Sequence, residues 1–256
     1  MAKHRRIWNE KTYRNHLREG RGQGAGSLYK PWIMVQDFAS KGMVSRAYGE
    51  KTGRVHHLLS NHETHFFYLL DWSDSVIDIR EQYPLLDLRE AVEIAERSGI
   101  RYPYDSASGF PYVLTSDFFI ETTNGIRIRT IKSEADLQNM RVREKLEIER
   151  RYWQNRKTDW KIVTENEINR QKARNIEWLS QAKDLDCLCI PSHMQASVLD
   201  YFLERYCSDQ QSLCGVFAEV ERRFALLPGT GLNIFKHLAY WKKVEIDINA
   251  MIERIA

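Results

Sequence analysis

Apolar and polar residues alternate over several short segments of the chain, and this two-residue period is typical of strands with one buried face. The period predicts strands over residues 32–38, 54–59, 76–82 and 160–164. Two further segments, residues 112–121 and 126–132, are rich in aromatic or β-branched residues and flank Asn124-Gly125. Because Asn-Gly between two such segments is the strongest short hairpin signal, we predict a β-hairpin with a type I′ turn.

Other segments place apolar residues three or four positions apart, which predicts amphipathic helices. After a short helical or irregular N-terminal arm, helices are predicted from Ser60 onward and over residues 88–98, 136–154, 168–183, 192–207, 213–224 and 232–240. Strands and helices mix in the first part of the chain, whereas the last part is mostly helical with one short strand at 244–248. We therefore predict an α/β domain over residues 1–167 and a winged-helix-like domain that binds DNA or a partner over residues 168–256.

The predicted hairpin brings a carboxylate and an ammonium together. With Asn124 and Gly125 as the loop, residue 117 pairs with residue 132, so Asp117 lies opposite Lys132. Directly opposite Cβ atoms are about 4.5–5.5 Å apart, so both charged groups can reach one metal ion, water or phosphate. This is the pattern of the PD-(D/E)xK nucleases, and the order of elements fits their α/β, restriction-endonuclease-like core. The alternative is a surface salt bridge, which contributes about 0–1 kcal/mol.

This nuclease pattern needs a further negative charge. Two residues before Lys132, where the pattern has Asp or Glu, the chain has Thr130, and a neutral hydroxyl is a poor ligand for a hard cation. We predict that Glu63, in the first turn of the helix after Ser60, supplies the carboxylate. Ser60 and Glu63 also fit an S-x-x-E capping box, in which the Glu only satisfies a backbone N–H.

Seven blocks of the sequence carry a resemblance that covers most of the chain. They are residues 19–24, 31–32, 51–60, 78–86, 116–118, 145–153 and 175–179. In this order they resemble the TnsA family, the endonuclease subunits of heteromeric cut-and-paste transposases. Blocks of this length are far more specific than a three-residue nuclease pattern.

The resemblance implies a Mg²⁺-dependent endonuclease, with Mn²⁺ as a substitute, that cuts the 5′ ends of a mobile element. It places Glu63, Asp117 and Lys132 on the three catalytic positions. Glu63 and Asp117 are the expected metal ligands, together with the Thr130 side chain or the backbone carbonyl of Ile131. Lys132 is expected to hold or deprotonate the attacking water, with a pKa lowered by the metal and partial burial. The implied partners are double-stranded DNA at transposon ends, a TnsB-like transposase that cuts the 3′ ends and a TnsC-like ATPase.

Glu149 is a further candidate, because it lies on the long helix that directly follows the catalytic strand. It stands four residues after Lys145, so an ordinary ion pair along the helix is one interpretation. The other is a supporting role in which Glu149 orients Lys132 or a water.

Composition narrows the classes of protein. A net charge of +3 over 256 residues favours local basic patches over nonspecific coating of nucleic acid. No run of about 18 apolar residues occurs, and the basic N-terminus is not followed by an apolar segment, so we expect a cytoplasmic protein without a membrane span. The four cysteines lack metal-site spacing and are expected to be reduced structural thiols. His62 and His65 are three residues apart rather than the four that a zincin helix needs.

Two other functions fit parts of the sequence. In a non-catalytic transposase assembly module, Glu63 is a cap and Asp117 with Lys132 a salt bridge, so metal ions have no effect that depends on Asp117. A stand-alone restriction-type nuclease instead cuts plain plasmid DNA at a fixed sequence without partners.

Overall fold

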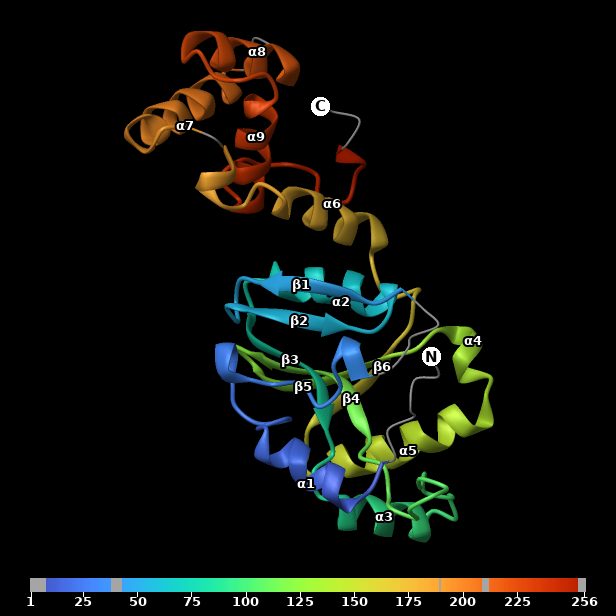
Figure 1. Ribbon diagram of the computed structural model, residues 1–256. Helices are drawn as coiled ribbons and strands as arrows, with labels where there is room; N and C mark the ends of the chain where they lie inside the picture. Colours follow the sequence, from blue (N-terminus) through green and yellow to red (C-terminus); the bar gives the residue numbers. More distant parts are fainter. Residues whose placement is uncertain (1–7, 38–42, 189, 209–211, 253–256) are drawn as a thin grey trace, which may run out of the picture. The chain divides into compact units, whose positions relative to one another are not determined.

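The computed structural model describes residues 8–37, 43–188, 190–208 and 212–252. The chain divides into two compact units, Met1–Ile168 and Asn169–Ala256 (Figure 1). The first unit is a mixed α/β structure and the second is helical in its described part. Each unit has its own core.

A four-stranded sheet forms the centre of the first unit, in the order β3-β4-β5-β6. Its strands are β3 (Val76–Pro84), β4 (Thr115–Thr122), β5 (Gly125–Ile131) and β6 (Asp159–Val163). The first three are antiparallel, and β6 runs parallel to β5. Strand β2 (Arg54–Leu58) was predicted, but it pairs with β1 (Ser45–Gly49) in a separate two-stranded sheet.

Helices cover both faces of the central sheet (Figure 1). Helix α2 (Asn61–Asp71) lies with β1 and β2 on one face, where Phe67 packs with Phe118 and Ile120. Helices α3 (Leu88–Arg97) and α5 (Met140–Asn155) lie on the other face, in the cluster that contains Phe119 and Ile148. Alternate residues of β4 therefore enter two different cores, as the period of a strand requires.

The hairpin forms, but its register differs from the predicted one by two residues. Thr122 pairs with Gly125 and Phe118 with Arg129, so Thr123 and Asn124 make the turn. The Thr122 hydroxyl accepts from the Asn124 N–H and donates to the Gly125 carbonyl. This local bonding, with Gly125 at φ +110°, replaces the predicted type I′ turn. A shift of two leaves every side chain on its predicted face.

Two other predicted elements are wrong or altered in the first unit. Residues 32–37 form no strand: Trp32 packs against the aromatic rings of Trp8 and Tyr13, and a 3₁₀ turn, Val35–Asp37, follows; residue 38 lies outside the described part. The helix predicted over residues 136–154 is split into α4 (Glu134–Leu137) and α5, because Asn139 caps α5 with its side chain. The predicted N-terminal arm contains helix α1 (Glu10–Arg18).

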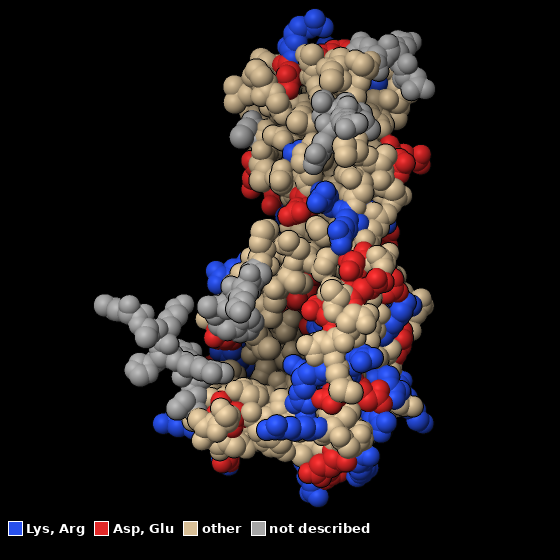
Figure 2. All heavy atoms as spheres, turned by 90° about the vertical axis from the view of Figure 1, so that its right-hand side faces the viewer, with Lys and Arg blue, Asp and Glu red and all other residues tan. Residues whose placement is uncertain are grey.

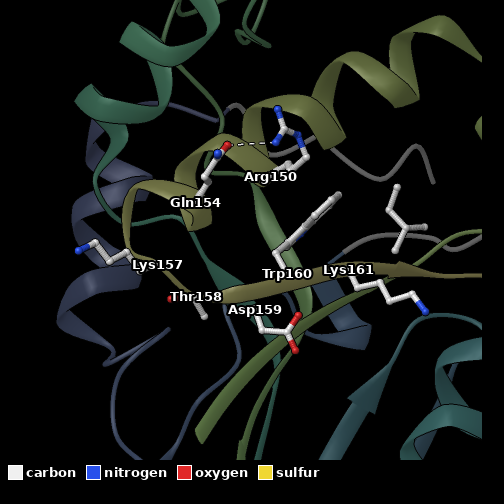
Figure 3. A pocket seen from close by; sticks show the side chains of 8 residues that line it. Arg150, Gln154, Lys157, Thr158, Asp159, Trp160 and Lys161 are labelled. Atoms are coloured by element: carbon white, nitrogen blue, oxygen red, sulfur yellow. Dashed lines mark hydrogen bonds between the residues drawn. The ribbon is translucent and has the colours of Figure 1, made fainter.

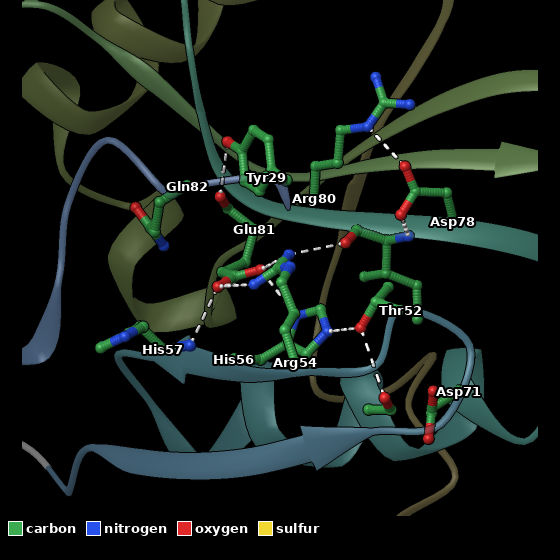
Figure 4. Close-up of polar contacts among 12 residues, drawn as sticks. Tyr29, Thr52, Arg54, His56, His57, Asp71, Asp78, Arg80, Glu81 and Gln82 are labelled. Carbon is green, nitrogen blue, oxygen red and sulfur yellow. Dashed lines mark hydrogen bonds and ion pairs between the residues drawn. The ribbon is translucent and has the colours of Figure 1, made fainter. Parts of the chain in front are cut away.

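A buried carboxylate links the small sheet to the central one (Figure 4). Glu81 of β3 accepts from both terminal nitrogens of Arg54, at 2.8 and 2.6 Å, and from His56 Nδ1 at 2.7 Å. It also accepts from the His57 N–H at 3.0 Å. All three partners belong to β2, so one side chain sets the position of β2 on β3.

The described residues of the second unit contain four α-helices and a 3₁₀ turn, Leu185–Leu188. The α-helices are α6 (Arg170–Ser180), α7 (Ser192–Tyr206), α8 (Leu213–Arg223) and α9 (Thr230–Tyr240). The strand predicted over 244–248 is wrong: the side chain of Asn175 donates to the carbonyls of Ile248 and Ala250, where a neighbouring strand would otherwise bond. The β element of a winged helix is therefore not seen in this part of the chain.

Two expectations from composition concern the whole chain. Cys187, Cys207 and Cys214 form no disulfide in the described structure and are exposed, so they do not pack in a core as structural thiols would; Cys189 lies outside the described residues. Within the described ranges, no helix is both long and apolar enough to span a membrane.

Candidate active site

Asp117 and Lys132 meet as the sequence predicts, although they are not directly paired. The Lys132 ammonium donates to Asp117 Oδ2 at 2.9 Å and to the Ile131 carbonyl at 2.8 Å. Asp117 Oδ2 also accepts from the Ile131 N–H at 2.7 Å. The observed register places Lys132 diagonally across from Asp117, and its long side chain spans the extra distance.

The protein groups alone keep Lys132 charged. Burial acts to lower the pKa of Lys132, but the Asp117 carboxylate and then Glu149 and Glu63 outweigh it, so the pKa lies above its ordinary value. The lowered pKa expected for a general base is therefore not a property of these residues by themselves. The ammonium serves here as a cation that two oxygens hold.

Glu63 takes part in a helix cap and interacts electrostatically with the Asp117–Lys132 pair. Ser60 Oγ accepts from the Glu63 N–H at 3.1 Å, and the Glu63 carboxylate accepts from Ser60 Oγ and the Leu59 N–H, both at 3.0 Å. Burial, followed by the charge of Asp117, raises the pKa of Glu63 to about 7, whereas Lys132 lowers it. The cap is therefore confirmed, and the charges of Asp117 and Lys132 both act on the Glu63 carboxylate. Its role as a metal ligand stays a prediction.

Gln82 is a member of this site that the sequence reasoning missed. Its Nε2 donates to Glu63 Oε2 at 3.2 Å, and its Oε1 accepts from Thr115 Oγ1 at 3.2 Å. Gln82 is buried in β3 and has a φ of +49°. A non-glycine residue at positive φ marks a local departure from a regular strand, and no local sequence pattern signals it.

Thr130 and Glu149 form a separate buried contact behind Asp117. Thr130 Oγ1 donates to Glu149 Oε1, which also accepts from Trp160 Nε1 at 2.9 Å. Burial raises the pKa of Glu149 to about 7, against the hydrogen bonds from Ser116, Thr130 and Trp160. The Thr130 hydroxyl is thus bonded to Glu149, and the ion pair between Glu149 and Lys145 does not form in the described structure.

A pocket of about 270 Å³ opens onto these groups. Asp117, Thr130, Lys132 and Glu149 line it from the strands and α5, and Lys145 lines it at its rim. A wider groove of about 600 Å³ lies between the end of α5 and the edge strand β6 (Figure 3). None of the candidate catalytic residues lines that groove, so the smaller pocket is the candidate active site.

The oxygens around the Asp117–Lys132 pair suit a divalent cation, and of the three groups named next only Asp117 lines the pocket. Two carboxylates, Glu63 and Asp117, and the Ile131 carbonyl are hard ligands of the kind that Mg²⁺ binds. Asp117 and the Ile131 carbonyl already hold a positive charge, the Lys132 ammonium. Among the described residues no three His, Cys, Asp or Glu side chains gather into a metal site. The two carboxylates would therefore need the Ile131 carbonyl and water molecules to complete the coordination shell.

The raised pKa of Glu149 predicts the pH dependence of stability. Its ordinary pKa is 4.5 and its folded pKa about 7, so between these values only the unfolded chain releases the proton, and stability falls as pH rises. Glu149→Gln keeps an oxygen acceptor for Thr130 and Trp160, but it has no carboxyl group and therefore no loss of stability from ionisation. We expect the variant to be more stable than wild type at pH 8 by about 1–3 kcal/mol, and equal to it near pH 4.

Chemical denaturation in EDTA from pH 4 to 8 measures this difference. Glu147→Gln on the same helix is the control, because hydrogen bonds from Arg150 and Arg151 lower the pKa of Glu147 to about 2 and its loss should reduce stability at pH 8. A constant difference between Glu149→Gln and wild type across this range would show that Glu149 is already charged in the folded chain.

The chain matches two family models, described as "TnsA-like endonuclease N terminal" over residues 73–165 and "TnsA endonuclease C terminal" over residues 167–248. It is also similar to "Transposon Tn7 transposition protein TnsA" of Escherichia coli, with 44% identity over 187 residues that cover 72% of this chain and 67% of that protein. The chain belongs to the TnsA family. The predicted resemblance is thereby confirmed. In this TnsA-family chain the first match includes Asp117, Lys132 and Glu149, whereas Glu63 precedes it.

Proposed function

We propose that the first unit is the catalytic domain of a Mg²⁺-dependent DNA endonuclease, which hydrolyses phosphodiester bonds at the 5′ ends of a mobile element during cut-and-paste transposition. The observation that carries this proposal is the Lys132 ammonium on Asp117 Oδ2 and the Ile131 carbonyl, with a Glu63 carboxylate whose pKa responds to both charges. A helix that carries Glu, then a hairpin that carries Asp and Lys, also supports a restriction-endonuclease-like core.

Glu63, Asp117 and the Ile131 carbonyl would hold the metal ion, which stabilises developing charge and acidifies a bound water. Lys132 donates hydrogen bonds to the phosphate as negative charge develops on it, a role that its raised pKa suits. The Ile131 N–H and Lys132 orient the Asp117 carboxylate. Gln82 and the cap at Ser60 orient Glu63, and the Thr130–Glu149 contact supports β5 from behind.

The partners belong to the same proposal. The substrate is double-stranded DNA at transposon ends, and a TnsB-like transposase and a TnsC-like ATPase complete the assembly. The similarity to a Tn7 transposition protein supports this. We assign the helical second unit to DNA or partner contact, because none of the candidate catalytic residues lies in it.

Metal titration tests the proposal against a non-catalytic assembly module. We expect Mn²⁺ and Mg²⁺ to raise the melting temperature of the wild-type chain, because a ligand at 100 times its Kd adds about 2.7 kcal/mol to stability. Asp117→Asn should abolish the rise. Asp159→Asn is the matched control, because Asp159 is an exposed carboxylate that pairs with Arg129 outside the pocket. Equal metal shifts in wild type and Asp117→Asn would favour the assembly module.

A further inference from the structure

One cation at the pocket, Lys145, has no counter-charge among the residues that the structure describes. Lys145 lies on α5 and lines the pocket together with Asp117 and Lys132. No carboxylate, hydroxyl or carbonyl of the described residues bonds its ammonium. Other basic side chains of α5 are paired along the helix: Arg141 with Glu144 at 2.7 Å, and Arg150 and Arg151 with Glu147 at 2.7 and 2.6 Å.

The acidic groups of the same pocket are already engaged. Asp117 Oδ2 is bonded to the Lys132 ammonium and the Ile131 N–H. Glu149, one turn after Lys145, is buried and accepts from Thr130 and Trp160. Lys145 therefore adds a positive charge that no group on this wall neutralises.

The surroundings of Lys145 favour an anion. Partial desolvation, and then the charges of Arg141 and Lys132, lower the pKa of Lys145. A negative group that approaches the ammonium offsets these effects, because it stabilises the charged form. Figure 2 shows Lys and Arg side chains interspersed with Asp and Glu side chains on the side of the first unit that carries α4 and α5, so the wider surface is of mixed charge.

The rest of the pocket wall has a different character. Ile33, Val113, Val142 and Leu146 line it with apolar side chains. A cation beside an apolar wall matches the two parts of a nucleic acid backbone, because the phosphate is anionic and the deoxyribose presents C–H groups. A single-atom anion would leave the apolar wall unused.

We propose that Lys145 binds a backbone phosphate next to the scissile one, on the DNA strand that is cut. This inference rests on the proposed nuclease function and adds a substrate-binding residue to it. Lys132, held at the base of the pocket by Asp117, is the cation for the scissile phosphate. Lys145 is on the rim and exposed, where the continuing strand passes.

The experiment measures 5′-strand cleavage by the full chain assembled with its transposase and ATPase partners. We expect Lys145→Gln to lower the cleavage rate at limiting DNA about 10- to 100-fold, the size of a lost hydrogen bond to a charged group, and Lys145→Arg to retain most of it. Arg143→Gln is the matched control, because it removes the same charge from the same helix. Arg143 is exposed and does not line the pocket. Thermal melts should show Lys145→Gln as stable as wild type.

A second series uses DNA with one neutral methylphosphonate at each phosphate around the cut. A methylphosphonate at the phosphate that Lys145 contacts should lower the cleavage rate of wild type to that of Lys145→Gln. The same substitution should not lower the cleavage rate of Lys145→Gln further. Two results would overturn the phosphate site: Lys145→Gln cleaves at the wild-type rate, or each methylphosphonate lowers the cleavage rates of wild type and Lys145→Gln by the same factor. The nuclease proposal would survive either result if Asp117→Ala is inactive. Cleavage by Asp117→Ala would instead overturn the nuclease proposal and this inference with it.

Discussion

Asp117→Ala is expected to abolish 5′-strand cleavage in the assembled transposase while the chain stays folded. Asp117 accepts hydrogen bonds from the Lys132 ammonium and the Ile131 N–H, and it is a predicted metal ligand. Its loss therefore removes both metal binding and the orientation of Lys132. Loss of one preorganised electrostatic group costs about 10²–10³ in rate, and we expect the loss of a metal ligand to be at least as large.

The folded state should tolerate this change. Lys132 keeps its bond to the Ile131 carbonyl, and Glu63 loses the neighbouring negative charge that raises its pKa. Cleavage is measured on end-labelled transposon DNA with all partners present, and folding by a thermal melt. Asp159→Ala serves as the control outside the pocket. Double-strand excision that persists in a folded Asp117→Ala variant would refute the assignment of Asp117.

The meeting of Asp117 with Lys132 was predictable from sequence even though the register was not. The turn depends on hydrogen bonds of the Thr122 hydroxyl, which the Asn-Gly signal does not include. The faces of the strands depend only on the two-residue period, and the observed register differs by two. A shift of one residue would have separated the pair.

Residue spacing predicts only part of what Glu63 does in the structure. The S-x-x-E pattern predicts the cap correctly, but a charge interaction with Asp117 requires that α2 begins beside β4. That position depends on the packing of Phe67 with Phe118 and Ile79, residues far apart in the sequence. The same reason applies to Gln82, whose contact with Glu63 depends on a positive φ, and to Glu149, whose burial depends on Trp160 of β6.

Two segments that were predicted as strands form none, and both for the same physical reason. Residues 32–37 and 244–248 have apolar side chains at strand-like spacing, and Trp32, Val244 and Ile248 are indeed buried. Burial was predicted correctly, but a strand also needs a neighbour for its backbone groups. In the first case an Arg21 nitrogen donates to the Trp32 carbonyl, and in the second Asn175 bonds the carbonyls of Ile248 and Ala250.

Glu81→Gln is expected to cause the largest loss of stability, about 3–5 kcal/mol, because removing one partner of a buried ion pair leaves the other uncompensated. Glu81 is fully buried and Arg54 nearly so. Burial acts to raise the pKa of Glu81, but His56 and Arg54 outweigh it and hold the pKa far below its ordinary value. The carboxylate therefore stabilises the fold at neutral pH, and this contribution declines as pH falls below the ordinary pKa of 4.5.

Urea denaturation at pH 7 and at pH 3 tests both the size and the sign of this effect. The difference between wild type and Glu81→Gln should be smaller at pH 3, where the unfolded wild-type chain has taken up a proton. Glu93→Gln is the control, because Glu93 makes only exposed ion pairs with Arg89 and Arg97 on α3 and should change stability by about 0–1 kcal/mol. Similar losses in both variants would mean that Glu81 does not fix β2 on β3. Since Gln82 follows Glu81 and holds Glu63, a loosened β3 should also reduce cleavage before the chain unfolds.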